Sequence, residues 1–187
     1  MTPTAPSAPD PAKSLLCAVL DNGEIALVRV VGRGNFSNSV PFKNFAAKLQ
    51  AAGRDLKFVL DLQNCDSMDS TFMGVLAGIC LTQLKGGLNK VIVVNANDHC
   101  KRLLKNLGLT HLLELRTGTL AEVERAEDVF APAKETQANR VDQICMMLEA
   151  HKELVRLDSK NEVQFQAVIE YLEKSLQDEG GCPPPKH

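Results

Sequence analysis

Two hydroxyl side chains, Ser70 and Thr71, stand next to an acid, Asp69, where a strongly apolar helix is expected to begin. A buried-type strand over 58–62 leads into this segment, and the apolar helix continues through 75–84. The first backbone N–H groups of a helix have no partner within it, and the helix dipole is positive at this end. Such a position suits an anion such as a phosphoryl group. We therefore expect the chemistry of this chain to centre on these hydroxyl groups.

The composition excludes several classes of function. The chain has 187 residues, 44% of them apolar, which is enough for the core of one ordinary domain plus an appendage. A net charge of −2, with no Trp and one Tyr, argues against a nucleic-acid-binding protein. No apolar run reaches the roughly 18 residues that cross a bilayer, and the N-terminus lacks a signal pattern. We predict a protein without a nucleic-acid or membrane partner.

The cysteines and histidines show no pattern typical of a catalytic or metal site. The six cysteines form no CxxC pair, and Cys17, Cys80 and Cys145 fall within apolar patterns, so we expect reduced thiols and a cytoplasmic protein. Cys65 lies close to the hydroxyl pair and would be redox-sensitive only if exposed. The four histidines are scattered, and no GxSxG, HExxH or Walker motif is present. We therefore predict no enzymatic activity, no metal and no cofactor.

The predicted elements alternate between strands and helices. Two β-prone runs, 15–20 and 25–31, flank Asn22-Gly23, which is typical of a β-hairpin. Further strands are expected at 57–62, 91–94 and 112–115. Helices are expected from caps at 37–39 to near Gly53, from about Ser70 to Lys85, from Asn97 to Gly108, and over 120–130. This order predicts an α/β domain over about 14–131, with helices packed against a mixed sheet.

The rest of the chain is expected to contain one further unit. Residues 1–13 read as a disordered lead-in, 132–138 as a linker and 179–187 as a disordered tail. Two amphipathic helices over 139–178, joined at a capping box in 159–162, predict a helical hairpin. Because its apolar stripe must be covered, the hairpin either folds back on the domain or pairs with another protein, giving a possible homodimer.

The motif around the hydroxyl pair resembles that of the anti-sigma factor antagonists, which are proteins of the STAS family (sulfate transporter and anti-sigma factor antagonist). The resemblance rests on Asp61-Leu62, Met68-Asp69-Ser70-Thr71, Gly74-Val75-Leu76, 90–95, 101–104, 107–109 and 112–115. It covers about 14–131, leaves the hairpin out, and implies a STAS fold. It also implies that a partner, both anti-sigma factor and Ser/Thr kinase, phosphorylates Ser70, with Thr71 as the fallback acceptor. The unphosphorylated protein would bind this partner and free the sigma factor, and a PP2C-type phosphatase would reset the switch.

The chain departs from the family pattern beside Ser70. The family commonly reads Asp-Ser-Ser/Thr-Gly-Leu-Gly, whereas here the first Gly is Phe72 and the Leu is Met73. Phe72 is either an anchor for a distinctive partner or packs inward beneath the site. The loop at 32–38 is either the second half of the docking surface or a plain strand-to-helix turn, and its two glycines do not complete a GxGxxG dinucleotide motif. The expected partner-binding residues are Asp69, Phe72, Met73, Arg33, Asn35 and Phe36.

Alternatives remain for the roles of the motif and for the function. Asp69 either caps the helix and orients Ser70, or helps to hold the magnesium nucleotide of the kinase. Ser70 is itself a favoured N-cap residue. Two rival functions are a scaffold subunit of a signalling complex that is never phosphorylated, and a STAS domain that binds a small anion or nucleotide at the helix N-terminus.

Overall fold

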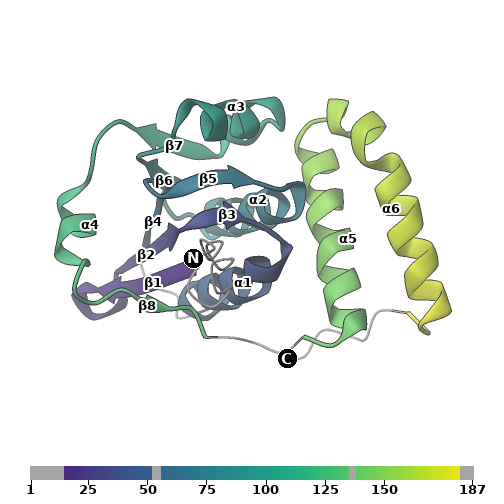
Figure 1. The fold of residues 1–187 in the computed structure, drawn as a ribbon, viewed down its shortest axis with the longest axis horizontal. Helices are drawn as coiled ribbons and strands as arrows, with labels where there is room; N and C mark the ends of the chain where they lie inside the picture. The colour runs from purple at the N-terminus through teal and green to yellow at the C-terminus, as the bar shows by residue number, and fades with distance from the viewer. Residues whose placement is uncertain (1–14, 52–55, 135–137, 182–187) are drawn as a thin grey trace, which may run out of the picture.

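The fold is built around one six-stranded sheet (Figure 1). The computed structural model describes residues 15–51, 56–134 and 138–181; the predicted lead-in, Gly53 and most of the predicted tail lie outside this range. The strand order is β7-β6-β4-β2-β1-β8. The strands are β1 (Leu15–Leu20), β2 (Ile25–Val30), β4 (Lys57–Asp61), β6 (Val91–Val94), β7 (Leu113–Arg116) and β8 (Ala131–Pro132).

The sheet is mixed, as predicted. Strands β2, β4, β6 and β7 run parallel to one another, whereas β1 pairs antiparallel with both β2 and β8. The predicted hairpin is confirmed: Leu20 is opposite Ile25, and Asp21 and Gly23 take positive φ values of 51° and 98° in the turn. The continuous apolar character of β4 fits its place in the centre of the sheet.

Six α-helices accompany the sheet in the described residues. They are α1 (Phe36–Gln50), α2 (Ser70–Lys85), α3 (Asp98–Asn106), α4 (Ala121–Arg125), α5 (Arg140–Leu157) and α6 (Lys160–Asp178). The predicted start and end of α2 are confirmed. The cap of α1 is not within 37–39 but at Asn35, whose Oδ1 accepts from the Ser37 N–H while Asn38 Oδ1 accepts from the Asn35 N–H. The helix predicted over 120–130 shortens to α4, because the chain leaves it to form the edge strand β8.

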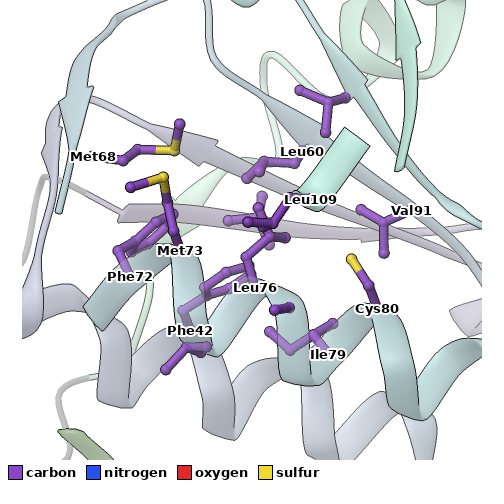
Figure 2. Packing of buried hydrophobic residues seen from close by; sticks show 14 of the residues in the cluster. Phe42, Leu60, Met68, Phe72, Met73, Leu76, Ile79, Cys80, Val91 and Leu109 are labelled. Atoms are coloured by element: carbon purple, nitrogen blue, oxygen red, sulfur yellow. The ribbon is translucent and has the colours of Figure 1, made fainter. Parts of the chain in front are cut away.

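Alternating side chains of the strands build two cores on opposite faces of the sheet. Ala26, Val28 and Val30 of β2 face one core, which also contains residues of α1 and α2. Leu27 and Ile25 face the other core, together with Val123 of α4. In the larger core, apolar side chains of α2 meet the sheet and α1, as Figure 2 shows. The face of the sheet that supports α2 therefore determines where Ser70 lies.

A second, two-stranded sheet lies next to Ser70 and was not predicted. Strand β3 (Gly32–Gly34) pairs parallel with β5 (Cys65–Met68). Both segments are short, and their composition is not typical of strands, so only their pairing defines them. The pairing brings the loop at 32–38 to the residues that precede α2.

The C-terminal hairpin folds back on the α/β domain. Helix α5 packs against α2, and α6 packs against α5 (Figure 1). The capping box predicted at 159–162 is wrong: the Ser159 side chain makes no cap, and Asp158 Oδ1 accepts from the Lys160 N–H. The Asn161 side chain instead donates to the carbonyls of Leu154 and Leu107, which joins the hairpin bend to the end of α3.

Of the five cysteines in the described residues, four behave as predicted. Cys17, Cys65, Cys80 and Cys100 are free, but Cys145 on α5 is disulfide-bonded, so the prediction of a reduced thiol there is wrong. An apolar helical pattern predicts the face of the helix on which a cysteine lies, but it does not predict whether a second cysteine can reach it to form a disulfide. Within 15–51, 56–134 and 138–181, no helix is long and apolar enough to span a membrane.

Candidate functional site

Asp69 is the N-cap of α2 and connects two helices. Its Oδ1 accepts from the Phe72 N–H at 2.8 Å, and its Oδ2 accepts from the N–H of Phe36, the first residue of α1, at 2.9 Å. Its own N–H donates to the Gly34 carbonyl at 2.8 Å. Of the two roles considered for Asp69, capping is the one that this geometry displays. A carboxylate already occupies the positive end of α2.

Ser70 is the first residue of α2, is half-buried, and contacts a histidine from the hairpin. Its Oγ lies 2.9 Å from Nε2 of His151 on α5. The other ring nitrogen, Nδ1, lies 2.7 Å from the Met147 carbonyl, which can only accept a hydrogen bond, so Nδ1 carries a proton. In the neutral ring Nε2 is then the acceptor, and the Ser70 hydroxyl donates to it.

His151 is enclosed where it meets Ser70. It is only 5% exposed, and its ring lies edge-on to Phe165 of α6 at 5.1 Å between centroids. Both ring nitrogens have a partner, so the buried imidazole is fully hydrogen-bonded. The contact thus places a polar pair, one member from each unit, at the junction of α2 and α5.

A glycine lets α5 approach α2 one turn beyond Ser70. A Cβ atom on Gly74 would lie 2.3 Å from the Ala150 carbonyl oxygen, closer than any real Cβ contact. Ala150 precedes His151 and is 2% exposed. The Gly74–Ala150 contact therefore fixes the depth at which His151 reaches Ser70.

The other three residues at the start of α2 are buried. Thr71, Phe72 and Met73 are 6%, 0% and 3% exposed. The Phe72 ring stacks on Phe42 at 5.0 Å, and Figure 2 shows Phe72 and Met73 within the apolar cluster. The structure shows the inward alternative for Phe72, and Met73 is buried with it, so a direct contact of these two side chains with a partner stays a prediction that this conformation does not display. Replacing the family glycine with Phe fills the core beneath the loop, because Gly34 leaves room for the ring.

The loop at 32–38 lies beside the start of α2, as expected. Arg33 is exposed, whereas Asn35 and Phe36 are half-buried. The hydrogen bonds of Asp69 to Gly34 and Phe36 hold the loop there. Of the predicted partner-binding residues, Asp69, Arg33, Asn35 and Phe36 are thus brought together at the surface next to Ser70.

Cys65 lies beneath this surface rather than on it. It is 2% exposed, and its sulfur lies 4.0 Å from that of Cys100. The contact with Cys100 and burial raise the pKa of the Cys65 thiol, which is therefore protonated at neutral pH. The exposure that the redox hypothesis required is absent.

His151 is the residue of this site that sequence reasoning missed. It stands 81 positions from Ser70, and no motif joins the two. One signal was present: His151 continues the apolar stripe of α5 through Ile144, Leu148 and Leu154. A histidine within such a stripe needs a buried polar partner, although the stripe does not identify that partner.

The comparisons with known proteins agree with this architecture. The STAS domain family model matches residues 18–124, more than half of the chain, so the chain belongs to the STAS family. A Thermotoga maritima protein proposed to be an anti-sigma factor antagonist is similar at 19% identity and a TM-score of 0.50, over 62% of this chain and 95% of that one. This likeness shows the fold alone.

Two further solved structures are similar over the same part of the chain. SpoIIAA of Bacillus in its phosphorylated form is similar at 15% identity and a TM-score of 0.49, over 60% of this chain and 99% of that one. An anti-sigma factor antagonist from Mycobacterium paratuberculosis is similar at 22% identity and a TM-score of 0.47, over 64% and 97%. No curated protein matches the chain. The family model ends before α5, so the hairpin that contacts Ser70 lies beyond the matched region.

Proposed function

We propose that this chain is a phosphorylation-controlled protein-binding switch of the anti-sigma factor antagonist type. Ser70 is the phosphoacceptor, and the partner is an anti-sigma factor that is also a Ser/Thr kinase. The observation that carries the proposal is the position of Ser70 in a STAS domain: it is the first helical residue after a capping aspartate and is half-buried, whereas Thr71 is buried. A PP2C-type phosphatase resets the switch, and the chain acts by binding rather than by catalysis.

Phosphorylation changes the charge of this surface more than it changes the domain. It adds about −1.5 to −2 charges, which the dipole of α2 favours and the nearby Asp66 and Asp69 oppose. Loss of about a hundredfold in partner affinity needs only about 2.7 kcal/mol. Like-charge repulsion and the desolvation of a phosphate at an interface supply a term of that size.

The docking surface combines Ser70 with the loop held beside it. Arg33, Asn35 and Phe36 border the start of α2, and Phe72 supports them from beneath. The alternative of a small-anion site at this helix end is less well supported, because the Asp69 carboxylate already accepts from the N–H groups of Phe72 and Phe36.

The proposal is tested by incubating the chain with candidate kinases and ATP, followed by Phos-tag electrophoresis. We expect a shifted band for the wild type and for Ser67→Ala, whose hydroxyl lies on the same surface beside His99. Ser70→Ala removes the acceptor and should abolish the shift. A shift that persists in Ser70→Ala refutes the assignment of the site, and binding of a partner without any phosphorylation favours the scaffold alternative.

A further inference from the structure

The face of α2 that carries Ser70 is already covered by this chain's own helix α5. His151 is buried against the Ser70 hydroxyl, and Ala150 lies against Gly74 one turn along α2. Met146, Ala150 and Leu154 of α5 and Phe165 of α6 belong to the same continuous core as Phe72 and Leu76 of α2. The hairpin is therefore packed on this face as an intramolecular occupant.

The docked hairpin engages the hydroxyl group that phosphorylation would modify. In the neutral ring the Oγ atom donates to Nε2 at 2.9 Å, so phosphorylation removes the hydrogen that makes this bond and puts a bulky dianion beside a buried ring. His151 cannot turn aside freely, because Nδ1 is bonded to Met147 and the ring lies against Phe165. A kinase faces the same obstacle, since it must bring a γ-phosphate to this oxygen.

We propose that the α5–α6 hairpin is a built-in cover of Ser70, and that hairpin docking excludes both the kinase-bound and the phosphorylated states of the site. This inference rests on the proposed function, because only the proposed function identifies phosphorylation as the modification of Ser70. Because coupling is reciprocal, whatever opens the hairpin favours phosphorylation, and phosphorylation favours the open hairpin. The apparent affinity of a partner for Ser70 equals its affinity for the open form multiplied by the fraction of chains in which the hairpin is open.

The same contacts indicate what opens the cover. When the hairpin leaves α2, Leu154, Phe165 and the apolar side of α2 become exposed to water, which is unfavourable. A partner that covers this face of α2 restores the lost burial, whereas solvent does not. The partner that fits is thus a protein with an apolar helix or groove that competes with α5, rather than one that touches only the loop at 32–38.

The first experiment tests the cover without any kinase. Gly74→Ala places a methyl group against the Ala150 carbonyl and should lift α5, while Gly78→Ala, one turn further along α2, meets nothing within 4 Å and is the matched control. Hydrogen exchange measured by mass spectrometry should be at least about tenfold faster over 140–157 in Gly74→Ala, with β2 and β4 unchanged. Ala150→Leu overfills a buried position of α5, where Ala150 is 2% exposed, and leaves the STAS domain sequence intact, which covers the case that Gly74→Ala fails to fold. Exchange over 140–157 equal to that of the control in both variants overturns the proposal.

The second experiment tests mutual exclusion with a chain that carries phosphoserine at position 70, introduced genetically during synthesis. We expect faster exchange over 140–157 and 160–178, whereas phosphoserine at the exposed position 37 leaves both helices protected. Full protection with phosphoserine at 70 shows that the phosphate fits beside His151 and overturns the proposal. A kinase that phosphorylates wild type and Gly74→Ala at equal rates also overturns the cover while leaving the switch intact. If the hairpin opens in these variants but no candidate kinase phosphorylates Ser70, the result supports the cover and refutes the proposed function.

Discussion

At the residue scale, the Ser70 hydroxyl is a structural group as well as the proposed acceptor. It satisfies the buried Nε2 of His151, so Ser70→Ala should cost about 1–3 kcal/mol, the penalty for an unpaired buried polar atom. The measurement is the free energy of unfolding in urea. Ser37→Ala at an exposed position is the control and should change stability by less than about 0.5 kcal/mol. An unchanged stability in Ser70→Ala would mean that the two side chains do not meet in solution.

Asp69 gives a graded prediction, because its two oxygens serve two helices. Asp69→Asn retains one acceptor for the Phe72 N–H but loses the acceptor for the Phe36 N–H, whereas Asp69→Ala loses both. We expect Asp69→Ala to cost about 1–2 kcal/mol or more of unfolding free energy, with Asp69→Asn between it and the wild type. Equal losses in the two variants would show that only one of the hydrogen bonds contributes.

The residue types at the start of α2 were predictable, but their surroundings were not. Asp69, Ser70 and the helix that follows form a local pattern, and local hydrogen bonding makes an aspartate at this point a cap. The direction of Phe72 depends instead on Gly34 and Phe42, which lie 38 and 30 positions earlier in the sequence. Contacts of this kind are chosen by the packing of the whole fold, so the sequence left both directions open.

At the element scale, a buried ion pair joins β2 to β4 on the face of the sheet opposite α2. Arg29 Nε donates to Asp61 Oδ2 at 2.6 Å, and both side chains are largely buried. Asp61 also accepts from Asn95 and from the Gln63 N–H. Asp61, which belongs to the family motif, therefore holds the end of β4 rather than contacting Ser70.

Breaking this pair should destabilise the sheet strongly. Arg29→Met leaves the Asp61 carboxylate buried without its cation, which typically costs about 3–5 kcal/mol. The double variant Arg29→Met/Asp61→Asn should recover part of this loss in urea unfolding, because no unpaired charge remains buried: Glu127, the other carboxylate bound to Arg29, is exposed. If the double variant is less stable than Arg29→Met alone, the charge of Asp61 is not the source of the loss.

Helix α4 is attached to the sheet by an ion pair that depends on pH. Lys57 Nζ on β4 lies 2.5 Å from Glu122 Oε1, and this hydrogen bond lowers the pKa of Glu122 below its ordinary value of 4.5. A carboxyl pKa that is lower in the folded state contributes stability above the unfolded value and loses it as pH falls through the folded value. The wild type should therefore exceed Glu122→Gln by less than about 1 kcal/mol near neutral pH, since the pair is partly exposed.

Thermal unfolding of the two proteins between pH 7 and pH 2.5 measures this difference. The gap should close on the acid side, whereas Glu124→Gln, an exposed residue of the same helix, should follow the wild type at every pH. A gap that stays constant into acid would assign the effect to packing rather than to charge.

The elements differ in how far their structure depends on local sequence or on contacts with distant parts of the chain. Some elements can be predicted from their local sequence alone. These are β1, β2, β4 and β6, through their apolar runs, and α2 and α3, through their caps. Strands β3, β5 and β8 are short and lack that pattern, and they exist because a neighbour supplies their hydrogen bonds. The hairpin was predicted as two helices, but its docking on α2 depends on Gly74 and Ala150, whose small size the periodicity does not record.

At the scale of the whole molecule, the fold decides whether the chain must associate. The apolar stripe of α5 is covered by α2 on one side and by α6 on the other. The sequence left open whether a second copy covers this stripe, and the structure shows that the chain covers it itself. Opening the hairpin without a partner would create an uncovered apolar surface on both units, which favours association.

This argument predicts the oligomeric state of three full-length chains. In light scattering after size exclusion, wild type and Gly78→Ala should have the mass of one chain at all concentrations, because their α2–α5 contact is intact. Gly74→Ala should show a mass that rises with concentration, since lifted α5 and bare α2 faces meet between molecules. A wild-type dimer would mean that the internal cover is incomplete and that a second copy completes it. A strictly monomeric Gly74→Ala with open α5 would mean that the exposed faces of α2 and α5 are too small to drive association.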